Sequence, residues 1–159
     1  MISETTLAQL AGIALTGRPL LICDVDEVVV HFTRDFEDFL AERALWLDTS
    51  SFALNGNIRH RDGNRPVENA RVAELIDTFF AERTLHMQPI DGAIDSLMEI
   101  GTAADVVLLT NLPHSAGEDR RRNLAMHGLP FPVVTNSGPK GPAIRQLAER
   151  ARAPTVFVD

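Results

Sequence analysis

Lysine, cysteine and tyrosine are almost missing from this chain of 159 residues, which has one cysteine, no tyrosine and only one lysine, Lys140, among its 15 basic residues. A single cysteine excludes an intrachain disulfide, and the N-terminus lacks the basic start and apolar core of a signal peptide. We therefore expect a protein of the reducing cytoplasm. No apolar run approaches the ~20 residues that cross a membrane, so we expect no membrane-spanning segment.

Acidic residues outnumber basic ones, and the formal net charge is -7 at pH 7. This charge argues against a nucleic acid or an anionic membrane as a partner. The apolar share of 45% and the charged share of 23% are typical of a globular protein. The length suits one domain with a small insert.

Short apolar runs alternate with helical patterns along most of the chain. The runs predict buried strands over 20–24, 105–109, 131–135 and 155–158. Apolar residues at helical spacing predict helices over 3–14, 93–101, 115–127 and 142–152. This alternation predicts an α/β fold with a doubly wound parallel sheet.

The stretch between the first two predicted strands differs from the rest. Residues 33–47 and 67–84 each carry one apolar stripe and are expected to be helices, and Asn55-Gly56 is a possible hairpin turn between 52–54 and Ile58. We therefore expect a small, mostly helical insert over 31–88. The core would be formed by two pieces of the chain, 1–30 and 89–159.

Polar side chains follow each of the predicted strands. Asp24 and Asp26 come after the first strand, Thr110-Asn111 after the second, Lys140 after the third and Asp159 after the fourth. Because parallel strands end at one edge of a sheet, where open α/β sheets bind ligands, we expect these side chains to lie close together. Two nearby acids repel each other, and a divalent cation or a lysine would relieve this repulsion. Arginine stands at every other basic position, so Lys140 is the one lysine that could do so.

This ordered set of strand ends resembles the haloacid dehalogenase superfamily of phosphohydrolases, with a Rossmann-like core and a cap inserted after the first motif. The resemblance implies a Mg²⁺-dependent phosphatase for a small phosphorylated metabolite. In this family an aspartyl-phosphate forms on the first acid, which implies Asp24 as nucleophile and Asp26 as general acid and base. It also implies Thr110, Asn111 and Lys140 as phosphate-binding residues, and Asp24, the Asp26 carbonyl and Asp159 as Mg²⁺ ligands.

Glu27 departs from the family pattern, which has a glycine after the second aspartate. Glutamate stiffens the bend and adds an acid, so a catalytically weak or inactive binding or regulatory protein of the same fold stays as the alternative. A phospho-accepting receiver domain fits less well, because its accepting Asp follows the third strand, where Thr135-Asn136 stands here. The sequence indicates neither the substrate nor the oligomeric state.

The remaining charged and reactive residues have simpler interpretations. Arg120-Arg121-Arg122 is interpreted as a solvated helix face, and Cys23 as a small buried apolar residue. The five histidines lack metal-ligand spacing and are interpreted as structural or solvated, although His31 and His114 lie close to motif residues.

Asp159 directly follows a predicted buried strand, a place where a domain rarely ends. The superfamily continues with a further helix and strand and a second acid. We therefore expect the sequence to be a piece of a longer chain, and an intact mass near 17.5 kDa for the source protein would contradict this.

Overall fold

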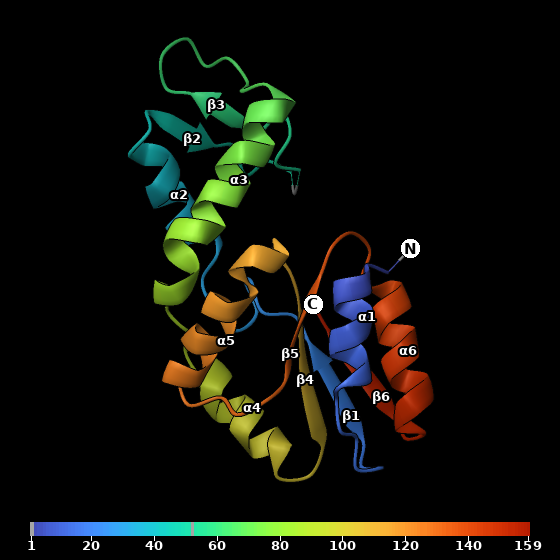
Figure 1. Cartoon of the computed structure of the whole chain (residues 1–159). Coiled ribbons are helices and arrows are strands. Elements are labelled where there is room, and N and C mark those ends of the chain that lie inside the picture. The colour runs from blue at the N-terminus through green and yellow to red at the C-terminus, as the bar shows by residue number, and fades with distance from the viewer. Residues whose placement is uncertain (1, 52) are drawn as a thin grey trace.

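The computed structural model describes residues 2–51 and 53–159. Its centre is a sheet of four parallel strands in the order β5-β4-β1-β6 (Figure 1). The strands are β1 (Leu20–Cys23), β4 (Asp105–Asn111), β5 (Val133–Asn136) and β6 (Thr155–Val158). The predicted α/β fold with a parallel, doubly wound sheet is thereby confirmed. Within the described ranges no helix has the length and apolar character needed to cross a membrane.

Helices cover both faces of the sheet, because successive side chains of a buried strand point to opposite sides. Leu20 and Ile22 of β1 pack in one apolar cluster with α1 and α6, whereas Leu21 and Cys23 belong to the cluster on the other face. Figure 1 shows α1 and α6 on one side and α4 and α5 on the other. The helices of the core are α1 (Glu4–Ala11), α4 (Ala93–Gly101), α5 (Gly117–Met126) and α6 (Gly141–Ala151).

The segment between β1 and α4, which we call the inserted segment, forms a group of its own beyond the carboxyl edge of the sheet, on the side of α5 (Figure 1). It contains α2 (Thr33–Ala41), β2 (Leu45–Leu47), β3 (Ile58–His60), α3 (Asn69–Arg83) and the 3-10 helix η1 (Thr84–His86). The ring of Phe79 packs edge-on against Phe36 and Phe39 at centroid distances of 5.1 and 5.5 Å. These aromatic contacts tie α3 to α2, as expected for the two apolar stripes.

The helix predicted over 33–47 is wrong in its second half. The chain leaves the helix after Ala41, and Ala44 adopts a positive φ of 55°. Residues 45–47 then pair antiparallel with 58–60 as β2 and β3. The apolar pattern alone fitted a helix, but pairing with a distant strand overrides such local preferences.

The hairpin predicted around Asn55-Gly56 is also displaced. Gly56 takes a positive φ of 84°, but the paired strands are β2 and β3, and Asn55-Gly56 lies inside the loop between them. Phe52, which the prediction assigned to the hairpin, lies outside the described residues.

Other element boundaries shift by a few residues. The helix predicted over 115–127 is divided into the 3-10 helix η2 (His114–Ala116) and α5. The strand predicted from Phe131 begins at Val133, since Pro132 has no N–H to donate to the ladder. Ser3 caps α1 as predicted, with its hydroxyl accepting from the Thr6 amide at 3.1 Å.

Asp105 joins the start of β4 to the loop that leads into β1. Its carboxylate accepts from the Thr16 amide at 2.7 Å and the Thr16 hydroxyl at 2.8 Å, and Arg18 pairs with it at 3.1 Å. Burial by itself would raise the pKa of Asp105, but the Thr16 hydrogen bonds and the Arg18 guanidinium outweigh it and hold that pKa below its usual value.

We expect Asp105→Asn to lower the free energy of unfolding at neutral pH by about 1–3 kcal/mol, because two hydrogen bonds to a charged, buried acceptor are weakened. A lowered pKa in the folded state stabilises above the unfolded pKa of about 3.9, and this contribution is lost as the pH falls through the folded value. The difference between wild type and variant should therefore shrink below about pH 4. Urea unfolding at neutral and acid pH measures it.

Asp91→Asn, at an exposed aspartate of the core, is the control and should change the free energy of unfolding by less than about 0.5 kcal/mol. A difference between wild type and Asp105→Asn that stays constant into the acid range would contradict the role assigned to Asp105.

Candidate active site

The strand order places a switch point of the sheet beside β1. The chain passes from β1 to β4 and β5 on one side and then returns to add β6 on the other side. Ligand crevices of open α/β sheets form at such a point. Asp24 leaves β1 there, with its amide donating to the Val158 carbonyl at 2.8 Å, so that Asp24 stands next to the end of β6.

Lys140 lies between the carboxylates that end β1 and β6. Its Nζ is 2.5 Å from Asp24 Oδ2 and 2.8 Å from Asp159 Oδ1. The Asp24 and Lys140 side chains are 14% and 13% exposed, whereas that of Asp159 is 61% exposed. The structure therefore brings together three of the predicted site residues from three separate strand ends.

The charges of this group shift one another's pKa. Burial raises the pKa of Asp24 to about 6, with the neighbouring Asp159 adding to the rise and Lys140 opposing it. Burial alone would lower the pKa of Lys140, but hydrogen bonds to Asp159 and Asp24 outweigh it and raise that pKa. The raised pKa of Lys140 keeps its ammonium charged. The raised pKa of Asp24 disfavours its carboxylate, but a value of about 6 still leaves Asp24 mostly ionised at pH 7, with Lys140 as its cationic partner.

Asp26 is bound on both of its oxygens. Oδ1 accepts from Arg120 at 2.5 Å, and Oδ2 lies 3.4 Å from the hydroxyl of Thr110. Burial raises the pKa of Asp26 above its usual value, while Arg120 and Thr110 oppose the rise. Asp26 therefore links the loop after β1 to Thr110, which is fully buried near the end of β4.

The buried position of Arg120 contradicts the interpretation of the arginine run as a solvated face. Its side chain is 0% exposed, and only Arg121 and Arg122 pair with acids on the surface of α5. A signal was present in the sequence, because Arg120 lies four residues after the apolar Ala116 and four before the apolar Leu124. The structure buries both of these residues. This spacing puts Arg120 on the inward face of the helix.

Asn111 is held at the edge of the sheet by the side chain that ends β5 and by a main-chain carbonyl of the loop after it. Its amide donates to the Gly138 carbonyl at 2.9 Å, and its oxygen accepts from Asn136 at 2.8 Å. Asn136 also donates to Gly138, which takes a positive φ of 82° that glycine adopts without strain. This network stabilises the turn that leads to Lys140. The sequence analysis assigned no role in the site to Asn136.

A cavity of about 260 Å³ opens over these residues. Asp24, Asp26 and Asn111 form its polar side, and its apolar side comes from the inserted segment. The apolar residues are Phe32, Leu54, Ile76 and Phe80. The polar residues of this cavity thus suit an anion with its metal ion or ammonium partner, and the apolar residues suit a small organic group.

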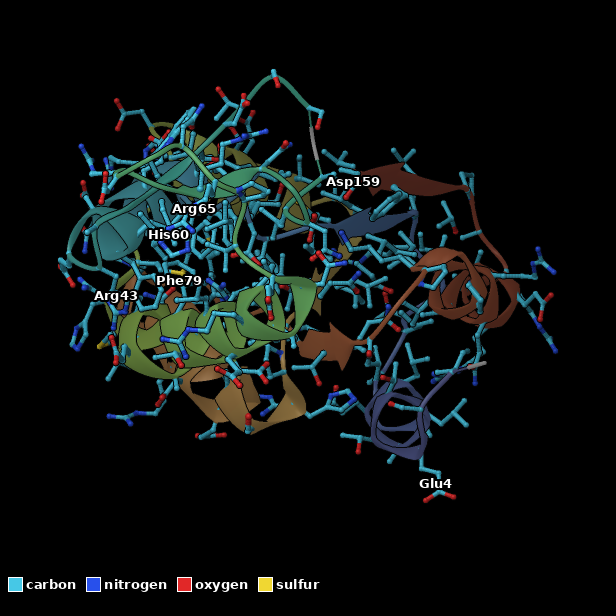
Figure 2. All side chains as sticks on the ribbon, turned by 90° about the horizontal axis from the view of Figure 1, so that it is seen from above. Glu4, Arg43, His60, Arg65, Phe79 and Asp159 are labelled. Carbon is cyan, nitrogen blue, oxygen red and sulfur yellow. The ribbon has the colours of Figure 1, made fainter. Side chains whose placement is uncertain are left out.

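A larger cavity of about 480 Å³ lies within the inserted segment and is lined by Arg43, His60 and Arg65, among others. Figure 2, seen from above, shows these residues grouped with Phe79, apart from Asp159 at the end of β6. None of the predicted site residues lines this larger cavity.

Glu27 lies in the bend that follows Asp24 and Asp26, and both its backbone and its side chain contribute to that bend. It adopts a positive φ of 59°, and its carboxylate accepts from the Phe32 and Thr33 amides at 2.9 and 3.1 Å. Burial would raise the pKa of Glu27, but these backbone hydrogen bonds outweigh it and lower that pKa. The residue that departs from the family pattern thus caps the first turn of α2 and links the acid loop to the inserted segment.

His114 and Cys23 have structural roles. His114 Nδ1 lies 2.6 Å from the Thr135 hydroxyl and Nε2 lies 3.0 Å from the Ser3 hydroxyl, so the ring joins η2 to β5 and α1. Cys23 is buried as predicted, and burial raises the pKa of its thiol to about 11, which keeps it protonated near neutral pH.

The oxygen donors at the strand ends are of the chemical type that a hard divalent cation prefers. When Asp24, Asp26 and Asp159 are all ionised, they face two cations, Lys140 and Arg120, and one negative charge is in excess. Across the described part of the chain, no three His, Cys, Asp or Glu side chains are grouped as metal ligands. Two carboxylates, one main-chain carbonyl and several waters are nevertheless a set that Mg²⁺ accepts.

No family model and no curated protein sequence matches this chain. Among solved structures, the chain is similar to a HAD family hydrolase from Deinococcus radiodurans R1 with bound phosphate and sodium. The TM-score is 0.51 at 15% sequence identity, over 87% of this chain and 70% of that one. The likeness shows that the chain has the haloacid dehalogenase fold, which the order of its strand-end residues predicted.

We expect Glu27→Ala to lower the free energy of unfolding by about 1 kcal/mol, because the cap of α2 is lost while the positive φ remains. Glu27→Gly also loses the cap but removes the backbone strain, which is worth about 1 kcal/mol. The glycine variant should therefore be the more stable of the two by about 1 kcal/mol in urea unfolding. An alanine variant as stable as the glycine variant would refute this account of Glu27.

Proposed function

We propose that the protein is a Mg²⁺-dependent phosphohydrolase, a phosphomonoesterase that acts on a small phosphorylated metabolite through an aspartyl-phosphate intermediate. The observation that carries the proposal is the Asp24–Lys140 contact at the switch point, with Asp26 beside it and a small cavity above. Phosphoryl transfer depends mainly on positioning and charge neutralisation, and this group of residues supports both.

In the proposed reaction the ionised Asp24 attacks phosphorus and the ester oxygen leaves. Lys140 pairs with Asp24 and supports its carboxylate form, and in this proposal its ammonium also pairs with the phosphoryl oxygens. Asp26 gives a proton to the leaving oxygen and then takes one from the water that hydrolyses the aspartyl-phosphate. Thr110 and Asn111, at the end of β4, hydrogen-bond the phosphoryl group.

Mg²⁺, held by Asp24, the Asp26 carbonyl and Asp159, would neutralise charge on the phosphoryl oxygens. Sodium and phosphate in the structure of the Deinococcus hydrolase support an ion and phosphate site in this fold. The excess negative charge at the strand ends is the feature of this chain that favours a bound cation.

The inserted segment, residues 31–88, acts in this proposal as a cap on the core formed by 1–30 and 89–159. Its apolar side chains line the cavity opposite the acids, so the substrate would direct its phosphate to Asp24 and its organic part to Phe32 and Phe80. A cavity of about 260 Å³ limits that organic part to a small group.

A second candidate is a binding or regulatory protein that retains the fold and turns over weakly. Two observations favour it: Glu27 occupies the usual glycine position, and Arg120 holds the Asp26 carboxylate from inside the protein. Such a protein would bind phosphate and Mg²⁺ and be stabilised by both, without releasing phosphate from esters.

The test is phosphate release from para-nitrophenyl phosphate and a panel of phosphorylated metabolites, with and without Mg²⁺. We expect release that depends on Mg²⁺ and falls by about 10³-fold or more in Asp24→Asn, because the nucleophile is lost. An acid quench during turnover should also leave the mass of one phosphoryl group on the peptide that contains Asp24.

Asp91→Asn makes the same chemical change at an exposed site and should retain full activity. Release that survives in Asp24→Asn would reject the aspartyl-phosphate mechanism. Stabilisation by phosphate and Mg²⁺ without any release would favour the binding protein instead.

A further inference from the structure

Arg120 is the largest fully buried side chain in the described part of the protein, and its charge has one carboxylate partner there, Asp26. Its Nε and NH1 atoms are buried without a hydrogen-bond partner, and NH2 also lies 3.5 Å from the Met87 sulfur. Burying a guanidinium without full pairing is costly, so a role beyond packing is expected for this residue.

The two oxygens of Asp26 face different surroundings. Arg120 binds Oδ1, and Arg120 is not among the described residues that line the 260 Å³ cavity. Asp26 itself does line that cavity, and Oδ2 lies beside Thr110 at the end of β4. Arg120 therefore reaches Asp26 from the protein interior, and Oδ2, whose contact with the Thr110 hydroxyl is long at 3.4 Å, is the oxygen more available for chemistry.

The helix that carries Arg120 is well fixed. Asn123 of α5 and His127, which directly follows the last residue of that helix, bind the Met87 carbonyl at 2.9 and 3.0 Å. Asn123 also donates to the Leu85 carbonyl at 3.1 Å. One helix face thus holds both Asp26 and the segment through which the chain returns from the insert to the core.

We propose that Arg120 is a positioning residue for the proton transfers of Asp26: by binding Oδ1 from behind, it presents Oδ2 to the reacting ester. This inference rests on the proposed phosphohydrolase function and goes beyond it. It assigns to a residue of α5 the orientation of the acid, whereas the strand-end motifs account only for the acid itself.

The proposed steps balance as follows. An oxygen of Asp24 forms a bond to phosphorus while the bond from phosphorus to the leaving oxygen breaks, and the proton on Asp26 Oδ2 moves to that oxygen. Water then forms a bond to phosphorus, its proton returns to Oδ2, and the bond between phosphorus and Asp24 breaks. Arg120 gives up no proton and contacts no reacting atom.

Leaving-group dependence separates positioning of the acid from simple structural support. Phenolate is a poor leaving group that needs a proton, whereas para-nitrophenolate leaves readily without one, and the two esters otherwise have similar shapes. We expect Arg120→Met to lower kcat/KM by about 10²-fold for phenyl phosphate and by less than about tenfold for para-nitrophenyl phosphate. Arg120→Lys keeps the charge but loses the planar guanidinium. It should also lower kcat/KM more for phenyl phosphate than for para-nitrophenyl phosphate, but both losses should be smaller than in Arg120→Met.

Two further comparisons complete the test. In an Asp26→Asn background, adding Arg120→Met should change kcat/KM by no more than about twofold for either ester, because the two residues act through one group. Arg122→Met, on the exposed face of the same helix, is the matched control and should leave both values unchanged.

Melting curves identify the folded variants, and the lysine variant decides the question if Arg120→Met does not fold. Equal losses for the two esters, or no loss for either, would overturn the positioning role while leaving the phosphohydrolase intact. A wild-type protein that hydrolyses neither ester nor any metabolite of the panel would instead overturn the proposed function, and the role of Arg120 with it.

Discussion

The contact of Lys140 with Asp24 and Asp159 is the interaction on which the arrangement of the site depends. It joins the start of α6 to the ends of β1 and β6, which meet where the direction of strand addition reverses. Without an interposed cation, the two neighbouring carboxylates at this sheet edge would repel, and burial would favour protonation of Asp24. The single lysine of the chain stabilises the ionised form of the acid that the proposed reaction requires.

A second cation solves the same problem for the second acid in a different way. Lys140 approaches from the loop beyond the sheet edge, whereas Arg120 approaches Asp26 from the interior, on a helix packed against the sheet. The same helix face binds the return segment at Leu85 and Met87. Charge balance at the edge and attachment of the inserted segment are therefore served by one element, and Glu27 provides a further link through its cap on α2.

Much of the fold was predictable because its signals are local. Buried parallel strands are short apolar runs, and β6 and α4 lie where the sequence predicted them. The segment 45–47 was not predictable in this way, since its apolar residues continue a helical stripe and become a strand only by pairing with 58–60. The burial of Arg120 was missed for a related reason. A run of three arginines suggests a solvent-exposed surface, and burial of one of them is tolerable only because Asp26, which follows β1, pairs with it.

By itself, the sequence determined the alternating architecture, the strand-end positions of Asp24, Asp26, Thr110, Asn111, Lys140 and Asp159, and the apolar stripes of α2 and α3. These features follow from periodicity and from the shared edge at which parallel strands end. Tertiary structure alone decided which partner binds each oxygen of Asp26, which acid pairs with Arg120 and how Glu27 is used. Those outcomes depend on distances between residues far apart in the chain, where burial makes each unpaired charge costly and thereby selects its partner.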